Sequence, residues 1–241
     1  MTIKGILFDK DGTLIDFERS WGPIIRICAD QVAGGDGALS ARLLGSIGVD
    51  GKTGDVAPGS IMAAGDTYDV ARAWIAVCGA GDEAALVETL DGLFETLILE
   101  HVAPVTDLDG LLSALKGDAL RLGVATNASV GEARSTLAHL KITDHFDFIA
   151  GYDSGFGSKP GPGMVHGFCE AVALEPGDVA VVGDNFHDLE MGRRAGAGLL
   201  IGVLTGTSAR ADLAPHADHV IENIADMPAL LVAGPPSQPS P

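Results

Sequence analysis

The chain has 241 residues, of which 46% are hydrophobic, enough for one large domain or two small ones with a proper core. Its 15 basic and 33 acidic residues give a formal net charge of −18, which repels nucleic acid and anionic membranes, so we expect neither as a partner. No run of about 20 apolar residues is present to span a membrane. The widely spaced cysteines, without a leader-like N-terminal pattern, predict a cytoplasmic protein.

The first predicted element is a buried strand over Ile3–Phe8, which ends abruptly in two carboxylates. Asp9 and Asp11 lie one residue apart and are followed by Gly12 and Thr13. Burying two charges beside a strand is costly unless a cation pairs with them. A hard divalent cation such as Mg2+ takes oxygen ligands and brings phosphate with it. For this segment alone, a solvated turn remains the alternative, since Asp-Gly is a common turn dipeptide.

The next stretch, from Asp16 to about His101, has a helical pattern and few candidate strands. Glycine and proline mark its breaks, notably around Gly48–Gly54 and at Pro58-Gly59. The predicted helices of this stretch are Phe17–Val32, Leu39–Ile47, Asp69–Val77 and Glu83–Glu100.

After Pro104 the pattern changes to strands that alternate with helices. The predicted strands are Leu122–Ala125, Phe146–Ala150, Val179–Val182, Leu199–Val203 and His219–Ile221. The predicted helices are Leu108–Lys116, Gly131–Leu140 (with Ser129 and Glu132 as a possible capping box), Met164–Ala173, Asp188–Ala195, Ala209–Ala214 and Met227–Val232. Short apolar runs separated by helices favour a parallel sheet covered on both faces.

The first strand must join this sheet across the helical stretch, so the expected fold class is α/β. We expect a Rossmann-like parallel sheet core with an inserted all-helical cap domain. The core comprises residues 1–15 and 103–233, and the cap comprises residues 16–102. The proline-rich residues 234–241 are predicted to be a disordered tail.

Polar clusters follow the predicted strands or lie in the loops beyond them. Their members are Asp9 and Asp11, Thr126 and Asn127, Lys159, and Asp184 with Asp188. In open parallel sheets, ligands bind beyond the carboxyl ends of the strands, so these distant positions are expected to meet in one crevice.

Each residue type in these clusters suits phosphoryl transfer. Asp9 can attack phosphorus and form an aspartyl-phosphate, and Asp11 can protonate the leaving oxygen and later activate water. Asp184 with Asp9 is expected to hold Mg2+. The Thr126 hydroxyl and the Lys159 ammonium are expected to bind the transferring phosphoryl group, as is the adjoining Asn127.

These segments resemble the motifs of the haloacid dehalogenase-like hydrolase superfamily, in the same order along the chain. The matching segments are Asp9-Lys10-Asp11-Gly12-Thr13, the strand ending in Thr126, Lys159-Pro160-Gly161-Pro162, and Gly183-Asp184-Asn185-Phe186-His187-Asp188. A helical insertion after the first motif resembles the phosphoglycolate phosphatase-like subgroup. The resemblance implies that Asp11 also gives the metal its backbone carbonyl and that Asp188 supports the metal site.

The chain departs from the family pattern at two positions. Lys10 stands where an apolar residue is commoner, and it is predicted to alter the charge at the mouth of the site; Asn185 stands where Ser or Thr is common.

The expected activity is that of a Mg2+-dependent phosphatase for a small phosphorylated metabolite, with phosphoglycolate as the subgroup default. A β-phosphoglucomutase-like phosphomutase is one alternative, although such relatives often carry valine where this chain has Thr13. A non-catalytic protein that binds a phosphometabolite is the other.

The residues that select the substrate are expected in the cap. Lys52, in the loop-like Gly48–Gly54 segment, and Arg26 are the candidates for contact with an anionic substrate. The pattern does not distinguish a monomer from a homodimer.

Overall fold

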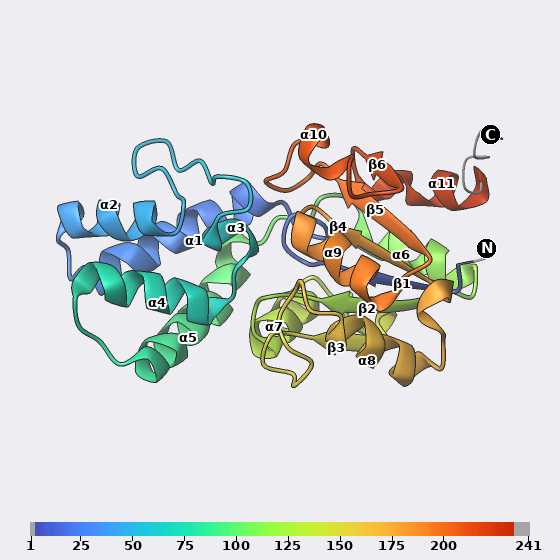
Figure 1. Ribbon diagram of the computed structural model, residues 1–241, viewed down its shortest axis with the longest axis horizontal. Helices are drawn as coiled ribbons and strands as arrows, with labels where there is room; N and C mark the ends of the chain where they lie inside the picture. The colour runs from blue at the N-terminus through green and yellow to red at the C-terminus, as the bar shows by residue number, and fades with distance from the viewer. Residues whose placement is uncertain (1–2, 234–241) are drawn as a thin grey trace.

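The computed structural model describes residues 3–233, and Figure 1 shows two groups of elements, a set of helices beside a helix-covered sheet. The sheet has six parallel strands in the order β3-β2-β1-β4-β5-β6. The strands are β1 (Gly5–Phe8), β2 (Arg121–Ala125), β3 (Phe148–Ala150), β4 (Val179–Gly183), β5 (Leu199–Val203) and β6 (His219–Ile221). Every strand predicted from the sequence is therefore present, and the predicted α/β class with a parallel sheet is confirmed.

The sheet strands are apolar along their length because both faces of the sheet are covered. One face packs on α6 (Leu108–Gly117), α7 (Val130–His139) and α11 (Met227–Ala233), and Ile6 and Phe8 of β1 point into this layer. The other face packs on α8 (Gly163–Val172), α9 (Phe186–Ala195) and α10 (Arg210–Leu213), where Leu7 lies. Successive residues of β1 thus enter opposite cores, as the period of two in a strand requires.

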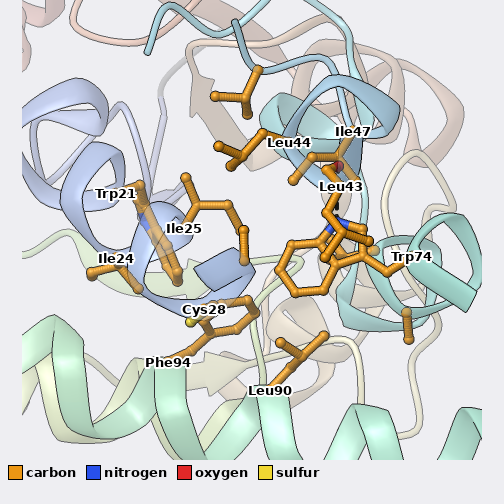
Figure 2. Packing of buried hydrophobic residues seen from close by; sticks show 14 of the residues in the cluster. Trp21, Ile24, Ile25, Cys28, Leu43, Leu44, Ile47, Trp74, Leu90 and Phe94 are labelled. Carbon is orange, nitrogen blue, oxygen red and sulfur yellow. Dashed lines mark hydrogen bonds between the residues drawn. The ribbon is translucent and has the colours of Figure 1, made fainter. Parts of the chain in front are cut away.

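The helical segment, residues 17–101, has a hydrophobic core of its own (Figure 2). It consists of α1 (Phe17–Val32), α2 (Gly37–Ser46), α3 (Ile61–Ala64), α4 (Thr67–Cys78) and α5 (Glu83–His101). Trp74 is fully buried and donates its indole N–H to Leu43 O, and the ring of Trp21 meets Phe94 edge-on at 5.2 Å between centroids. The four helices predicted here are present with ends shifted by at most two residues, whereas the short α3 was not predicted.

Five of the 33 acidic residues begin helices. Each of α1, α2, α4, α5 and α6 has an aspartate N-cap whose carboxylate accepts a hydrogen bond from a backbone N–H of the first turn. These N-caps are Asp16, Asp36, Asp66, Asp82 and Asp107. The net charge therefore reflects local folding requirements as well as surface solubility.

Two chain crossings join the helical segment to the sheet. Asp16 N donates to Ala103 O at 2.8 Å, and the buried Ser20 hydroxyl accepts from Ala103 N, so both crossings are fixed together. Among the described helices, none combines the length and apolar character needed to cross a bilayer. The predicted disordered tail, residues 234–241, lies outside the described residues.

Candidate active site

The polar clusters predicted from the sequence line a single pocket between the sheet and the helical segment. The pocket-lining members are Asp9, Asp11, Thr126, Asn127, Lys159, Asp184 and Asp188. They meet because β1 pairs with β2 and β4 in parallel, with Phe8 opposite both Val124 and Val182, so that these strands end at one edge. The expected convergence at the carboxyl ends of the strands is therefore what the fold produces.

Lys159 lies between two buried carboxylates at the base of this pocket. Its Nζ is 2.5 Å from Asp9 Oδ1 and 2.6 Å from Asp188 Oδ1, and all three side chains are at least nine-tenths buried. The second oxygen of Asp188 accepts from Asn185 N in the capping box of α9. Asp188 is thus both part of the helix cap and a member of the site.

Burial and like charges alter the protonation of this group of residues. Burial raises the pKa of Asp9 to about 7, opposed by Lys159 and reinforced by Asp188 and Asp11. Burial also raises the pKa of Asp184 well above its usual value, with Asp9 and Asp188 adding to the shift. For Lys159, burial acts to lower the pKa, but the carboxylates of Asp188 and Asp9 outweigh it and raise the pKa above its ordinary value. Full ionisation of Asp9 and Asp184 would therefore place more negative charge in the site than Lys159 balances.

The carboxylates fit a divalent cation. Oxygens of Asp9, Asp184 and Asp188 lie within 4.8 Å of one another, and all three residues are buried. Three carboxylates against the single ammonium of Lys159 leave two negative charges, which a hard dication that takes oxygen ligands would neutralise. Gly12, with φ of +84°, permits this packing, because a Cβ there would lie 2.8 Å from Asp184 Oδ1.

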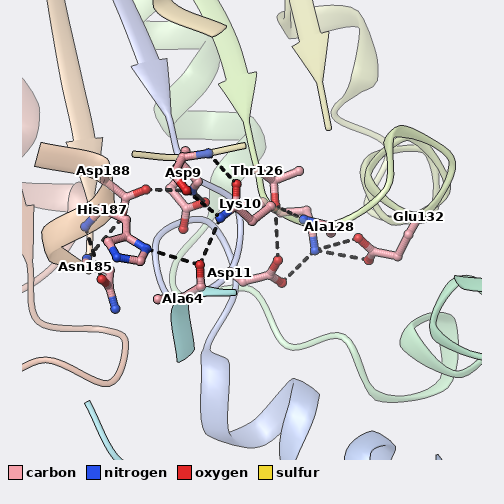
Figure 3. Close-up of polar contacts among 12 residues, drawn as sticks. Asp9, Lys10, Asp11, Ala64, Thr126, Ala128, Glu132, Asn185, His187 and Asp188 are labelled. Atoms are coloured by element: carbon pink, nitrogen blue, oxygen red, sulfur yellow. Dashed lines mark hydrogen bonds and ion pairs between the residues drawn. The ribbon is translucent and has the colours of Figure 1, made fainter. Parts of the chain in front are cut away.

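Asp11 points away from this carboxylate cluster, toward Lys10 and Thr126 (Figure 3). Its Oδ1 accepts from Lys10 Nζ at 2.6 Å and from the indole N–H of Trp21 at 2.5 Å, and Thr126 Oγ1 donates to its Oδ2 at 3.4 Å. The Asp11 carboxyl is therefore held by groups from both parts of the structure, beside the cluster rather than within it.

The prediction that Lys10 alters the charge at the mouth of the site is wrong. Lys10 is completely buried and pairs with Glu132 as well as Asp11, at 3.0 and 2.6 Å, and its Nζ lies 5.4 Å from the centre of the Trp21 ring. Burial acts to lower the pKa of Lys10, but Asp11 and Glu132 raise it above its ordinary value. The Lys10 ammonium has no access to solvent, and α7 supplies its buried partner Glu132.

This pairing also explains why the predicted capping box at α7 is only half formed. Ser129 Oγ accepts from Glu132 N as predicted, but the Glu132 carboxylate turns inward to Lys10 and Thr136 instead of bonding back to the N-cap. Sequence reasoning missed Glu132 as part of the site. The available signal was a lysine at a position where an apolar residue is commoner, directly after a buried strand, because a lysine buried there needs a carboxylate partner.

The Asn127 side chain, predicted to bind phosphate, lines the pocket and holds the Lys159 loop in this structure. Its Oδ1 accepts from Lys159 N at 2.8 Å, and its Nδ2 donates to Lys159 O and to Ala64 O. With both amide hydrogens and the oxygen engaged, the side chain fixes the backbone of Lys159.

Residues 61–67 of the helical segment lie across the pocket and bond to the sheet side. Ala64 O faces both Asn127 Nδ2 and His187 Nδ1, and Ser158 Oγ donates to Asp66 Oδ2 at 2.7 Å. These bonds hold the helical segment against the catalytic edge of the sheet. Neither Ala64 nor Asp66 was singled out from the sequence, because a four-residue helix between glycines has no periodic pattern to detect.

The predicted specificity residues Arg26 and Lys52 lie outside the residues that line the pocket. The guanidinium of Arg26 packs against Gly54, and Lys52 is exposed in a turn where its backbone N–H donates to Asp50. The loop-like character of residues 48–54 was a poor guide, because the wall of the pocket comes from α1, α3, α4 and α5 instead.

Comparison with known proteins finds phosphatases of similar sequence. The chain is 24% identical to rat N-acylneuraminate-9-phosphatase over 154 residues, 64% of this chain, and spans 62% of the length of that relative. It is 28% identical to phosphoglycolate phosphatase of Rhodospirillum rubrum over 210 residues, which cover 82% of this chain and 78% of that protein.

A solved structure shares the fold. CbbY from Rhodobacter sphaeroides, determined in complex with phosphate, superposes with a TM-score of 0.69 at 21% identity, over 94% of this chain and 96% of that one. The sequence pattern that defines haloacid dehalogenase-like hydrolases matches residues 3–196. Since that match extends over more than half of its length, the chain belongs to the haloacid dehalogenase-like hydrolase family.

Proposed function

We propose that the protein is a Mg2+-dependent phosphomonoester hydrolase that acts on a small phosphorylated metabolite through an aspartyl-phosphate. The observation that carries this proposal is the placement of Asp9. Its carboxylate lies in the pocket against the Lys159 ammonium and within the group of three carboxylates that suits a dication. A buried nucleophile next to fixed positive charge is what phosphoryl transfer requires.

In the first step, a carboxylate oxygen of Asp9 forms a bond to phosphorus while the bond from phosphorus to the leaving oxygen breaks. Asp11 gives its proton to that oxygen, so the product leaves as an alcohol. In the second step, water attacks the phosphorus of the aspartyl-phosphate and Asp11 takes a proton from it. Phosphate is released and Asp9 is regenerated, with all atoms and charges balanced.

The remaining residues bind and orient. Lys159 and the Thr126 hydroxyl offer hydrogen bonds to the phosphoryl oxygens, and Asn127 holds the Lys159 backbone in position. Asp9, Asp184 and Asp188, with the backbone carbonyl of Asp11, are the proposed holders of Mg2+. When bound, Mg2+ neutralises the phosphate oxygens and the neighbouring carboxylates, which restores Asp9 to its ionised, nucleophilic form.

Contacts across the pocket give the helical segment a role as the proposed cap. The bonds from Ala64 and Asp66 to the sheet side close the pocket over the reacting group. Closure excludes bulk water during attack on phosphorus, and reopening releases the alcohol and admits the water for hydrolysis.

Partners and place of action follow as further proposals. We propose a small phosphorylated substrate as the ligand, no nucleic acid or membrane partner, a cytoplasmic location, and action as a monomer or homodimer. Cell fractionation and light scattering of the purified protein test location and assembly.

The test of the activity is phosphate release from a panel of phosphorylated metabolites, with Mg2+ and with a chelator, for the wild type and for Asp9→Asn. Release that needs the metal and is lost in the variant supports the proposal. Activity that survives chelation would remove the metal from the account. Isomerised sugar phosphate without phosphate release would favour the β-phosphoglucomutase-like alternative, and no turnover of any ester would favour a binding protein.

A further inference from the structure

The wall of the pocket that faces the reacting carboxylates from the helical segment is apolar. It is formed by Phe17, Trp21, Ile61, Met62, Val70 and Phe94. Only the part of a substrate beyond the phosphate can contact this wall, because the phosphoryl group must lie at Asp9 and Lys159. The wall therefore determines which alcohols fit as leaving groups.

This wall has no positive charge to offer. Of the described residues that line the pocket, Lys159 is the only lysine or arginine, and its ammonium is already shared by Asp9 and Asp188. The cap side instead contributes the carboxylate of Asp66, which accepts from Ser158 Oγ and from Asp69 N. An anionic leaving group would therefore meet apolar side chains and a further negative charge.

We propose that the physiological leaving group is an uncharged alcohol with an apolar face, and that monoesters carrying a second anion, phosphoglycolate among them, are poor substrates. This inference rests on the proposed phosphatase activity and names its substrate class. The physical reason is desolvation, because a carboxylate enclosed by apolar groups loses its water and gains no partner in exchange. A neutral, apolar leaving group instead gains contact with Trp21, Met62 and Phe94.

The inference departs from the subgroup expectation, and the structure supplies the reason. Arg26 and Lys52, the cations expected to meet an anionic substrate, lie outside the pocket lining. The phosphoglycolate default came from the subgroup resemblance, and among the described residues that line the pocket no second lysine or arginine is present to meet its carboxylate.

The test compares three esters of nearly equal size: 2-phosphoglycolate, its carboxamide and its methyl ester. The carboxamide removes the charge and keeps the shape, and the methyl ester also removes the hydrogen-bond donors. With Mg2+ and wild-type enzyme, kcat/KM is expected to be lowest for 2-phosphoglycolate, higher for its carboxamide and highest for its methyl ester. The difference between 2-phosphoglycolate and its methyl ester is expected to be at least about tenfold. A carboxylate turned over as well as, or better than, both neutral compounds would overturn the inference.

A pair of variants tests the wall directly. Met62→Lys places a cation of similar length on the wall, and Met62→Gln is the uncharged polar control. Met62→Lys is expected to raise kcat/KM for 2-phosphoglycolate relative to the methyl ester by about tenfold over Met62→Gln. Equal ratios in the two variants would overturn the inference, with folding of both checked by thermal unfolding. Failure of the proposed function itself has a different signature, since wild type and Asp9→Asn would then release no phosphate from any of the esters.

Discussion

The buried pair of Lys10 and Glu132 makes the strongest energetic prediction. Both side chains are essentially inaccessible to solvent, and Lys10 Nζ lies 3.0 Å from a Glu132 oxygen. Lys10→Met keeps a side chain of similar length but leaves the Glu132 carboxylate buried without its ammonium. Removing one partner of a buried ion pair costs about 3–5 kcal/mol, because the remaining charge is uncompensated.

The assay is urea unfolding followed by circular dichroism in the presence of Mg2+. With a slope of about 3 kcal/mol per M, near the upper end for small proteins, this loss moves the midpoint down by about 1–2 M. The control is Lys4→Met, because Lys4 forms an ion pair with Asp178 at 2.9 Å with its side chain 56% exposed. Such a surface pair contributes about 0–1 kcal/mol, so the control midpoint is expected to move little.

The double variant Lys10→Met, Glu132→Leu removes both fully buried charges and is expected to recover most of the lost stability, since the remaining partner of Lys10, Asp11, is partly exposed and keeps its hydrogen bonds from Trp21 and Thr126. A single variant no less stable than Lys4→Met would refute the reasoning. A double variant as unstable as the single would refute it as well, since the loss would then come from packing rather than charge.

Three further predictions concern the site. Trp21→Phe removes the hydrogen bond from the indole to Asp11 but keeps an aromatic ring against Phe94 and on the pocket wall. We therefore expect kcat to fall about tenfold, a larger change than in KM; a change in KM alone would contradict this role. The pKa of Asp9 in the folded protein, about 7, exceeds its value in the unfolded chain, so the protein with its metal chelated should lose stability as pH rises from about 4 to 7. Asp9→Asn should flatten this loss, and Mg2+ should offset it. Identical dependence of the melting temperature on pH in the wild type and the variant would oppose this prediction. Asn127→Ala frees the Lys159 backbone and is expected to lower kcat/KM about tenfold, measured by phosphate release, with little change in melting temperature.

The fold could be predicted because its strands are short apolar runs, buried on both faces and separated by amphipathic helices. The convergence of the site also followed from the sequence, since parallel strands bring their carboxyl ends to one edge whatever their distance along the chain. Asp9, Lys159, Asp184 and Asp188 each lie just beyond a strand or in its loop, and all of them line the pocket.

What the sequence did not predict is the direction in which side chains point once the helical segment packs on the sheet. Lys10 reads as a surface charge in the sequence, and only the position of α7 shows that Glu132 buries it. The direction of the Asn127 amide, which bonds to Lys159 and Ala64, could likewise not be read from the sequence. Arg26 was chosen for its charge, but no local pattern specifies which side of α1 faces the pocket.

The central claim is that Asp9 becomes covalently phosphorylated during turnover. Its most direct test is to mix the enzyme with Mg2+ and a substrate from the panel, quench with acid, and determine the protein mass and the modified peptide. We predict one added phosphoryl group on the peptide that contains Asp9, and none in Asp9→Asn. Phosphate release without such an intermediate, or a phosphoryl group on another residue, would contradict the account.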